Sequence, residues 1–284
     1  MLSPNQKADL NEKANRILQA RLPPQTSFLI TALNNQGRLV GETALVGGAI
    51  RDLVMHILHG TNFDPKDLDI ATPLSPEQIE EAVRREVPGS GFTLKGVIRS
   101  TTSAEQVQEG ISAYPVVIVI LVNNIDGGEV GFEVATYRSD TESGWEPSNS
   151  MYQDAARRDL TINSLYAGLG PDGRWVLYDP TGLGIRDLYT RTARFNGNPP
   201  ERIKEDLVRA LRMLRIASCM GLEPTRESMQ AVQGLCDKVA NLAGDRITPE
   251  LRKMLDGSME VVFRSLELLR ESLVWDALFP SEGG

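Results

Sequence analysis

The sequence predicts an α+β protein with a head domain of strands and helices at residues 1–195 and an all-helical domain at residues 196–284. Two observations indicate this fold class. Strand-like alternation and helical spacing take turns along the first part of the chain, whereas the second part has helical spacing throughout. A composition break, Asn196-Gly-Asn-Pro-Pro200, separates the two parts. The length of 284 residues also suits two domains of about 100–200 residues each.

The composition excludes several protein classes. Apolar residues make up 41% and charged residues 24% of the chain, enough to bury an ordinary core. Two cysteines, Cys219 and Cys236, indicate a reducing compartment, and we expect both to be buried in the helical domain. The apolar run at 115–122 is far shorter than the roughly 18–20 residues that span a bilayer. With a polar, mixed-charge N-terminus, the protein is expected in the cytoplasm, without a membrane partner.

Charge is unevenly distributed along the chain. The net charge of −8 argues against a protein that coats a polyanion. Residues 151–215, however, contain eleven Lys or Arg, ten of them Arg, against eight acidic residues. Arginine suits bidentate contact with phosphates and base edges, although surface ion pairing is the alternative for any single one.

The elements of the head domain follow from spacing and capping signals. The double glycine Gly47-Gly48 ends a short strand and starts a helix, and Ser75 before Pro76 caps another helix. The expected elements are helix 4–21, strand 43–47, helix 49–59, strand 68–72, helix 76–85, strands 116–122 and 130–137, and helix 151–167. Beyond the break, helices are expected at 201–219, 225–241, 248–256 and 259–278.

Two carboxylates define the sharpest local signal. Asp67 and Asp69 are two residues apart on an expected strand, so both project from the same face. They would repel each other unless a cation lay between them, and paired divalent ions neutralise phosphates and activate an attacking hydroxyl. Glu133, between apolar residues of another expected strand, is a candidate third ligand, with a solvated surface position as the alternative.

A phosphate-binding turn is predicted shortly before these carboxylates. Gly48 begins a helix whose free N–H groups suit phosphate oxygens, and Arg51 in its first turn could contact the same group. The segment has neither the Walker nor the Rossmann glycine pattern. His56 and His59, one turn apart on the same helix with no cysteine beside them, do not indicate a zinc site.

Arg158, Asp159 and Asn163 lie in an expected helix. Asn163 follows Asp159 by four residues, so both would share a helix face. This pair could hold ribose hydroxyls while Arg158 meets a triphosphate.

A second arginine-rich segment has helical spacing. Arg209, Arg212 and Arg215 form one stripe, with Asp206 three residues before Arg209. Ion pairing would explain Asp206 and Arg209 but leave the other two arginines without a partner. An Asp and an Arg together can present an acceptor and a donor to the edge of a free nucleotide base.

Together these stretches resemble the class II tRNA nucleotidyltransferases and bacterial poly(A) polymerases of the DNA polymerase beta-like superfamily. Five elements occur in the family's order between about residues 45 and 255. They are LVGGAIRD (45–52) with DLDIAT (67–72), ARRDLTINSL (156–165), YDPTGLGIRDL (178–188), EDLVRALRMLR (205–215) and AGDRITPELRKML (243–255). The resemblance implies a polymerase beta-like head with a small mixed sheet, followed by a helical neck for nucleotide selection and RNA binding.

The resemblance also implies roles for individual residues. Asp67 and Asp69 would bind two Mg²⁺ ions, with Glu133 as the third catalytic carboxylate. The nucleotide-binding residues would be Gly48, Arg51 and Arg158 at the triphosphate, Asp159 at the ribose, Asp206 and Arg209 at the base of CTP or ATP, and Arg212 and Arg215 in the same pocket. More structural roles would fall to Asp179, Gly182 and Asp187 between head and neck, and to Arg246 and Glu250 in the neck.

The implied reaction is template-independent addition of C and A nucleotides from CTP and ATP to tRNA 3′ ends. The 3′-hydroxyl would attack the α-phosphate in line with pyrophosphate departure. CC-only addition, A-only addition and poly(A) synthesis are alternatives within the family. A nucleotidyltransferase acting on a small molecule such as an aminoglycoside, or a non-catalytic RNA-binding relative, are alternatives outside this activity.

Three features depart from the family pattern. Only 18 residues separate Arg138 from Arg157, where full CCA-adding enzymes carry a flexible loop, and a short segment there resembles the CC-adding members. Residues 99–114 resemble an insertion. The 284 residues cover a head and neck, so we expect a reduced tail or a shortened form, and the resemblance leaves an organellar location open.

Overall fold

The computed structural model describes residues 3–37, 42–99, 116–141 and 144–280. The chain divides into two compact units. The head unit comprises Met1–Ala155 and Asn163–Pro180, and the helical unit comprises Ala156–Ile162 and Thr181–Gly284. This division differs from the predicted boundary at residue 195, because segments before that residue pair inside the helical unit. Leu160 forms a β-bridge with Phe195, and Thr192 pairs with Glu223.

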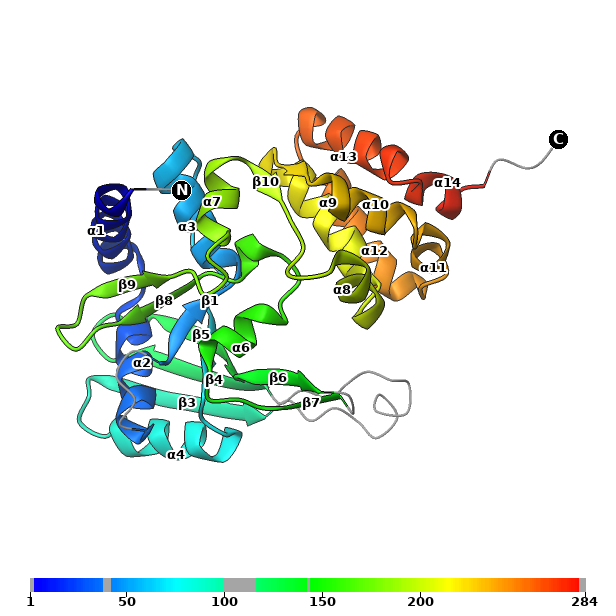
Figure 1. The fold of residues 1–284 in the computed structure, drawn as a ribbon. Coiled ribbons are helices and arrows are strands. Elements are labelled where there is room, and N and C mark those ends of the chain that lie inside the picture. The colour runs from blue at the N-terminus through cyan, green and yellow to red at the C-terminus, as the bar shows by residue number, and fades with distance from the viewer. Residues whose placement is uncertain (1–2, 38–41, 100–115, 142–143, 281–284) are drawn as a thin grey trace. The chain divides into compact units, whose positions relative to one another are not determined.

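The head unit contains most of the strands (Figure 1). Its elements are α1 (Pro4–Arg21), α2 (Pro24–Gly37), β1 (Ala44–Val46), α3 (Gly48–His59), β2 (Asp69–Thr72), α4 (Pro76–Glu86), β3 (Phe92–Arg99), β4 (Val116–Asn123), β5 (Glu129–Thr136), β6 (Arg138–Thr141), β7 (Gly144–Pro147), α6 (Met151–Ala156), which crosses the unit boundary, β8 (Tyr166–Leu169) and β9 (Trp175–Tyr178). The family-atypical segment predicted at 99–114 lies outside the described residues, apart from Arg99 at the end of β3.

Seven of these strands form one mixed sheet in the order β3-β4-β5-β2-β1-β8-β9. Strands β2 and β5 run parallel, and the other neighbours in this sheet run antiparallel. Strands β6 and β7 form a separate hairpin. The predicted fold class, a small mixed sheet with helices followed by a helical region, is confirmed.

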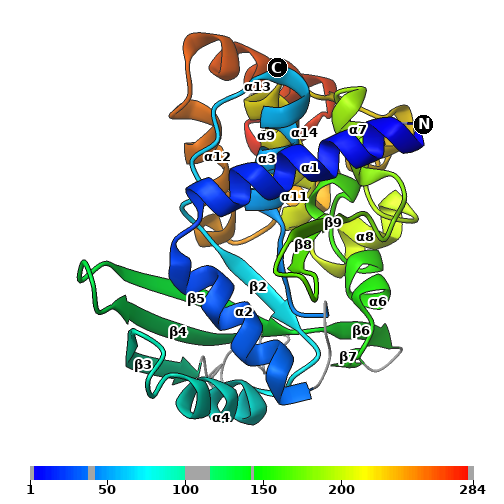
Figure 2. The same cartoon turned by 90° about the vertical axis from the view of Figure 1, so that its left-hand side faces the viewer.

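Cross-strand register gives the sheet two chemically different faces. Val117, Val134, Ile70, Leu45 and Ala167 follow one another across β4, β5, β2, β1 and β8, and all are fully buried. Figure 2 shows α1 and α2 lying across one side of the sheet. Because side chains alternate along a strand, the neighbours of these apolar residues project from the opposite face.

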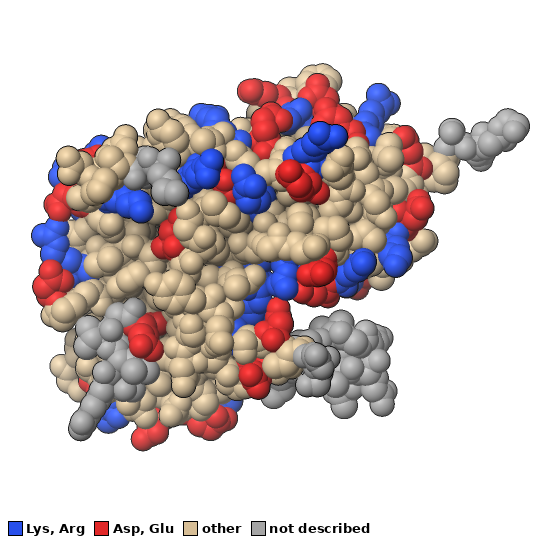
Figure 3. All heavy atoms as spheres, in the orientation of Figure 1, with Lys and Arg blue, Asp and Glu red and all other residues tan. Residues whose placement is uncertain are grey.

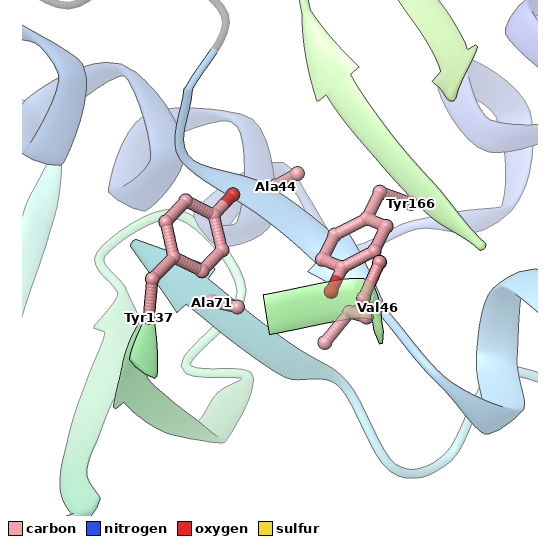
Figure 4. Packing of buried hydrophobic residues seen from close by; sticks show 6 residues of the cluster. Ala44, Val46, Ala71, Tyr137 and Tyr166 are labelled. Atoms are coloured by element: carbon pink, nitrogen blue, oxygen red, sulfur yellow. The ribbon is translucent and has the colours of Figure 1, made fainter. Parts of the chain in front are cut away.

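That opposite face is apolar at one end and acidic at the other. Tyr137 and Tyr166 pack edge to face, with ring centroids 6.3 Å apart, in a cluster with Ala44, Val46 and Ala71 (Figure 4). The Tyr166 hydroxyl donates a 2.7 Å hydrogen bond to the buried Asp154 carboxylate. The acidic end belongs to the candidate site described below.

The helical unit is built around α9 (Figure 1). Its elements are α7 (Gly184–Tyr189), β10 (Thr192–Ala193), α8 (Pro199–Glu205), α9 (Val208–Met220), β11 (Glu223–Pro224), α10 (Arg226–Gln233), α11 (Cys236–Ala240), α12 (Gly244–Leu255), α13 (Met259–Glu271) and α14 (Val274–Leu278). Most of α9 is buried, because α8, α12 and α13 pack around it.

Several predicted helices are interrupted in the structure. The helix predicted at 201–219 breaks at Asp206, whose extended backbone separates α8 from α9 and whose carboxylate accepts a hydrogen bond from the Val208 N–H. Asp side chains compete in this way with helical hydrogen bonds. The helices predicted at 225–241 and 259–278 likewise divide into α10 with α11 and α13 with α14.

The helix predicted at 151–167 is wrong beyond Ala156. There α6 ends, and the chain instead pairs with residues 194–196 of the helical unit. The Thr161 N–H donates to the Arg194 carbonyl, and the Asn196 N–H donates to the Asp159 carbonyl. Tertiary hydrogen bonding therefore overrides the local helical spacing.

Other predictions differ in smaller ways. Helices α1 and α4 are confirmed, and Ser75 caps α4 in a capping box with Gln78. No prediction covers helices α2 and α7 or strands β3 and β6–β11. The expectation of buried cysteines is wrong, since Cys219 is exposed and Cys236 is partly exposed. None of the described helices is both long and apolar enough for a bilayer crossing.

Candidate functional site

The structure places two of the predicted catalytic carboxylates side by side. Asp69 begins β2 and lies directly opposite Glu133 of the parallel strand β5. Both side chains are exposed, whereas the next pair, Ile70 and Val134, is fully buried. Asp67 is also exposed and precedes the buried Leu68, so the alternation of the strand extends back to it. The exposed face of β2 and β5 therefore presents Asp69 and Glu133, and the exposed Asp67 lies two residues before β2 begins.

The donor chemistry of this face suits a hard divalent cation. Carboxylate oxygens are the ligands that Mg²⁺ prefers, and it retains waters where a site is open. Among the described residues, no three His, Cys, Asp or Glu side chains converge into a metal-binding group. The carboxylates share a face without converging, so joint coordination would require rotation of exposed side chains.

The start of α3 lies at the same edge of the sheet. Strands β1 and β2 are antiparallel, with Leu45 opposite Ile70, so the end of β1 lies beside the beginning of β2. Gly47 follows β1 with φ 79° and ψ −133°, a conformation that glycine adopts without strain. No side chain caps the helix that begins at Gly48. Its first-turn N–H groups are therefore near the carboxylate edge.

Arg51 is held against this first turn. Its Nε and Nη2 both lie 2.8 Å from Asp52 Oδ1, and Nη1 donates a 2.9 Å hydrogen bond to Asn163 Oδ1. A Cβ atom at Gly48 would lie 3.6 Å from Arg51 Nη2, so the guanidinium extends over the glycine. This arrangement places the Arg51 guanidinium, paired with Asp52, beside the amino end of α3.

The predicted partnership of Asp159 with Asn163 is wrong. The two residues do not share a helix face, because α6 ends at Ala156, and Asn163 instead accepts the hydrogen bond from Arg51. Asp159 is buried in the helical unit, where its Oδ2 lies 3.2 Å from Arg212 Nη1. Arg158 lies beside it and its carbonyl accepts a hydrogen bond from Asn196.

Electrostatics keep Arg212 charged. Burial alone would lower the pKa of Arg212, but the Asp159 carboxylate, with weaker contributions from Glu250 and Asp206, outweighs it and raises the pKa above its ordinary value. Arg212 therefore provides a permanent positive charge surrounded by acidic groups.

Asp206 and Arg209 each have a different partner in the helical unit. Asp206 Oδ1 lies 2.6 Å from Arg246 Nη2. Arg209 Nη1 lies 2.5 Å from Glu205 Oε2, and Nη2 donates a hydrogen bond to the Arg157 carbonyl. The ion pair predicted between Asp206 and Arg209 is thus replaced by two others. The sequence could have indicated the pair of Glu205 with Arg209, because residues four apart are neighbours on a helix.

Arg215 is also paired, contrary to the expectation that it and Arg212 lack partners. Its Nε lies 2.6 Å from Oε2 of Glu250, which is buried on α12. Acidic and basic side chains lie next to one another over the helical unit, as Figure 3 shows. The buried Asp187 accepts hydrogen bonds from Thr161 and Arg194 of the same unit, and its role between head and neck stays a prediction.

Comparison with known proteins identifies the family. The model of the poly A polymerase head domain matches residues 43–194. This chain belongs to that family. CCA tRNA nucleotidyltransferase 1, mitochondrial, from Danio rerio is 34% identical over 225 residues, covering 76% of this chain and 44% of the relative. The CCA-adding enzyme of Bacillus licheniformis is 31% identical over 244 residues, covering 84% and 51%.

This chain is also similar to poly(A) polymerases and to solved structures of CCA-adding enzymes. Poly(A) polymerase I of Escherichia coli O157:H7 is 29% identical over 258 residues, covering 84% of this chain and 47% of the relative. The Bacillus stearothermophilus CCA-adding enzyme in complex with CTP superposes with a TM-score of 0.66 at 25% identity, covering 93% of this chain and 56% of that one. The Thermotoga maritima CCA-adding enzyme complexed with tRNA shares the fold, with a TM-score of 0.67 at 21% identity, covering 96% and 57%. The chain spans about half the length of these relatives.

Proposed function

We propose that this protein is a template-independent RNA nucleotidyltransferase that adds C and A nucleotides from CTP and ATP to tRNA 3′ ends. The side-by-side placement of Asp69 and Glu133 on an exposed sheet face, in a head domain of this family, carries the proposal. The CCA-adding names of the zebrafish and Bacillus relatives support tRNA as the substrate.

The head unit would perform the chemical step. Asp67, Asp69 and Glu133 would hold Mg²⁺, which supplies charge neutralisation at the phosphates and a lower pKa for the attacking hydroxyl. First-turn N–H groups at Gly48 and the guanidinium of Arg51 would orient the triphosphate, so that the RNA 3′-hydroxyl attacks the α-phosphate in line with departing pyrophosphate.

The helical unit would select the nucleotide. Asp159 would accept a hydrogen bond from the ribose, and Arg158 would meet the triphosphate. Asp206 supplies a carboxylate acceptor and Arg209 a guanidinium donor for the edge of cytosine or adenine. Arg212 and Arg215 would contribute positive charge to the same nucleotide pocket.

Two narrower activities have specific support. The short segment between Arg138 and Arg157 favours an enzyme that stops after two C additions, as the CC-adding members do. The match to E. coli poly(A) polymerase favours repeated A addition. For location, the two free cysteines favour a reducing compartment such as the cytoplasm, and the mitochondrial name of the zebrafish relative makes the mitochondrion the alternative.

The test uses the purified chain with Mg²⁺ and tRNAs that end before the CCA sequence, after the first C, or after both Cs. Each tRNA is incubated with labelled CTP, labelled ATP or both, and products are resolved at single-nucleotide length. The proposal expects two C additions and then one A. Products that end at CC would indicate a CC-adding enzyme, a long A ladder would indicate a poly(A) polymerase, and no incorporation would refute the proposal.

A further inference from the structure

A pocket of about 330 Å³ in the head unit takes no part in the proposed chemistry. Its lining includes Glu42, Met151, Tyr152, Tyr178 and Asp179. Met151 and Tyr178 also pack against the apolar cluster of Figure 4, so this cluster holds one wall of the pocket in place. Tyr152, by contrast, is 70% exposed and presents its ring to solvent.

Cross-strand register places this pocket on the same sheet face as the carboxylates. Tyr178 of β9 lies opposite Tyr166 of β8, which lies opposite Val46 of β1. Continuing the β1–β2 register by one residue brings Val46 beside Asp69. Neighbouring strands are about 4.8 Å apart, so three strand steps separate the backbones of Tyr178 and Asp69 by about 14 Å. A few nucleotides of a single strand would cover that distance.

The lining of the pocket suits an aromatic ring and disfavours phosphate. Its lining includes two carboxylates, Glu42 and Asp179, and none of the lining residues that the structure describes is Lys or Arg. Carboxylates accept hydrogen bonds from the amino groups of cytosine and adenine and repel phosphates. Burial, and then the neighbouring Tyr152, raises the pKa of Tyr178, so its hydroxyl stays neutral and can donate.

We propose that this pocket stacks a nucleobase of the RNA, a few nucleotides before the 3′ end that is extended, on Tyr152 with Tyr178 as its inner wall. Stacking on an aromatic side chain tolerates any base, so it would hold the strand while the 3′ end changes from one addition to the next. The inference rests on the proposed function, since it names where the RNA substrate is held.

The test measures equilibrium binding of a tRNA lacking its CCA sequence, without nucleotide, so no catalysis is needed. Tyr152→Ala is expected to weaken binding roughly fivefold or more, the usual loss for one stacked base. Tyr152→Phe retains the ring and should bind as the wild type does. Tyr189→Ala removes another exposed tyrosine, on α7, and should leave binding unchanged.

RNA with one abasic nucleotide at each of the last positions identifies the stacked base. At one position, the wild type should bind the abasic RNA more weakly than intact RNA. Tyr152→Ala should bind the abasic RNA and intact RNA equally well, because the substitution and the missing base remove the same contact. Unchanged binding by Tyr152→Ala, or additive losses at every position, would overturn the inference. The inference would also be overturned if Tyr152→Ala raised the KM for CTP or ATP and left the KM for tRNA unchanged, because Tyr152 would then contact the free nucleotide. Wild-type incorporation of CTP and ATP tests the proposed function separately.

Discussion

The head unit and the helical unit hold their charged candidate residues in opposite ways. In the head unit, Asp69 and Glu133 are brought together by backbone register and project from an exposed face. In the helical unit, Arg209, Arg212 and Arg215 each pair with an acidic side chain of the same unit. Carboxylates are thus presented outward, whereas guanidinium groups are fixed by neighbours.

This difference suits the head unit to cation binding and the helical unit to recognition of a nucleotide base. Carboxylates on the exposed face of rigid strands are accessible to a cation from solvent. Planar guanidinium groups that are already held by carboxylates lose less rotational freedom when they bind a ligand, which favours discrimination between similar bases. The following substitutions separate the two behaviours.

The largest effect is expected at the head-unit carboxylates. Asp69→Ala should reduce nucleotide incorporation about a thousandfold or more, because a metal ligand supports several kcal/mol of transition-state stabilisation. Since Asp69 is exposed, the free energy of unfolding should change by about 0.5 kcal/mol or less. Binding of Mn²⁺ should weaken in parallel. Wild-type incorporation by a folded Asp69→Ala protein would contradict the assignment.

The second effect concerns stability of the helical unit. Arg215→Ala leaves Glu250, which is only 7% exposed, without its partner, and should lower the free energy of unfolding by about 2 kcal/mol. Arg264→Ala, which breaks a pair with the exposed Glu223, should cost about 0.5 kcal/mol or less. Denaturant unfolding measures both. Equal losses would show that the burial of Glu250 does not matter.

The third effect concerns base choice. Arg209→Ala should reduce discrimination between CTP and ATP about tenfold, because one donor to the base edge is lost. Arg202→Ala serves as the control, since Arg202 also pairs with Glu205, 2.6 Å away, but has no proposed base contact. The ratio of kcat/KM for the two nucleotides is the readout. An unchanged ratio in Arg209→Ala would remove this residue from nucleotide selection.

The smallest effect tests a purely local rule. Ser75→Ala removes the side-chain cap of α4 and should cost about 1 kcal/mol of unfolding free energy without altering incorporation. Ser75→Asp, which preserves a capping oxygen, should restore most of it. A loss of activity in the alanine variant would connect α4 to the reaction and contradict the division of roles.

More of the head unit than of the helical unit could be predicted from the sequence, because strand alternation and glycine positions act between residues close in the chain. The spacing of Asp67 and Asp69 predicts that both lie on one strand face, and the structure begins β2 at Asp69. The double glycine located the start of α3. Strand alternation alone could not pair Asp69 with Glu133, which are 64 positions apart, because register depends on the whole sheet.

Long-range partners explain what sequence reasoning missed. Arg246 meets Asp206 and Glu250 meets Arg215 across 40 and 35 positions, so no helical spacing rule links them. The chain after Ala156 leaves its helix because Asp159, Thr161 and Asn196 form hydrogen bonds that exist only in the folded unit. Tertiary contacts of this kind override propensity.

In the proposed reaction, carboxylates of two adjacent strands carry nucleotide addition to RNA. Glu133→Gln tests it most directly, with Glu129→Gln as the matched control on the same strand and face. Incorporation of labelled CMP into a tRNA lacking its CCA sequence is measured for both variants and the wild type. We expect Glu129→Gln to match the wild type, whereas Glu133→Gln should lose about a hundredfold or more of the incorporation rate. Equal rates for the two variants, or no incorporation by the folded wild type, would contradict it.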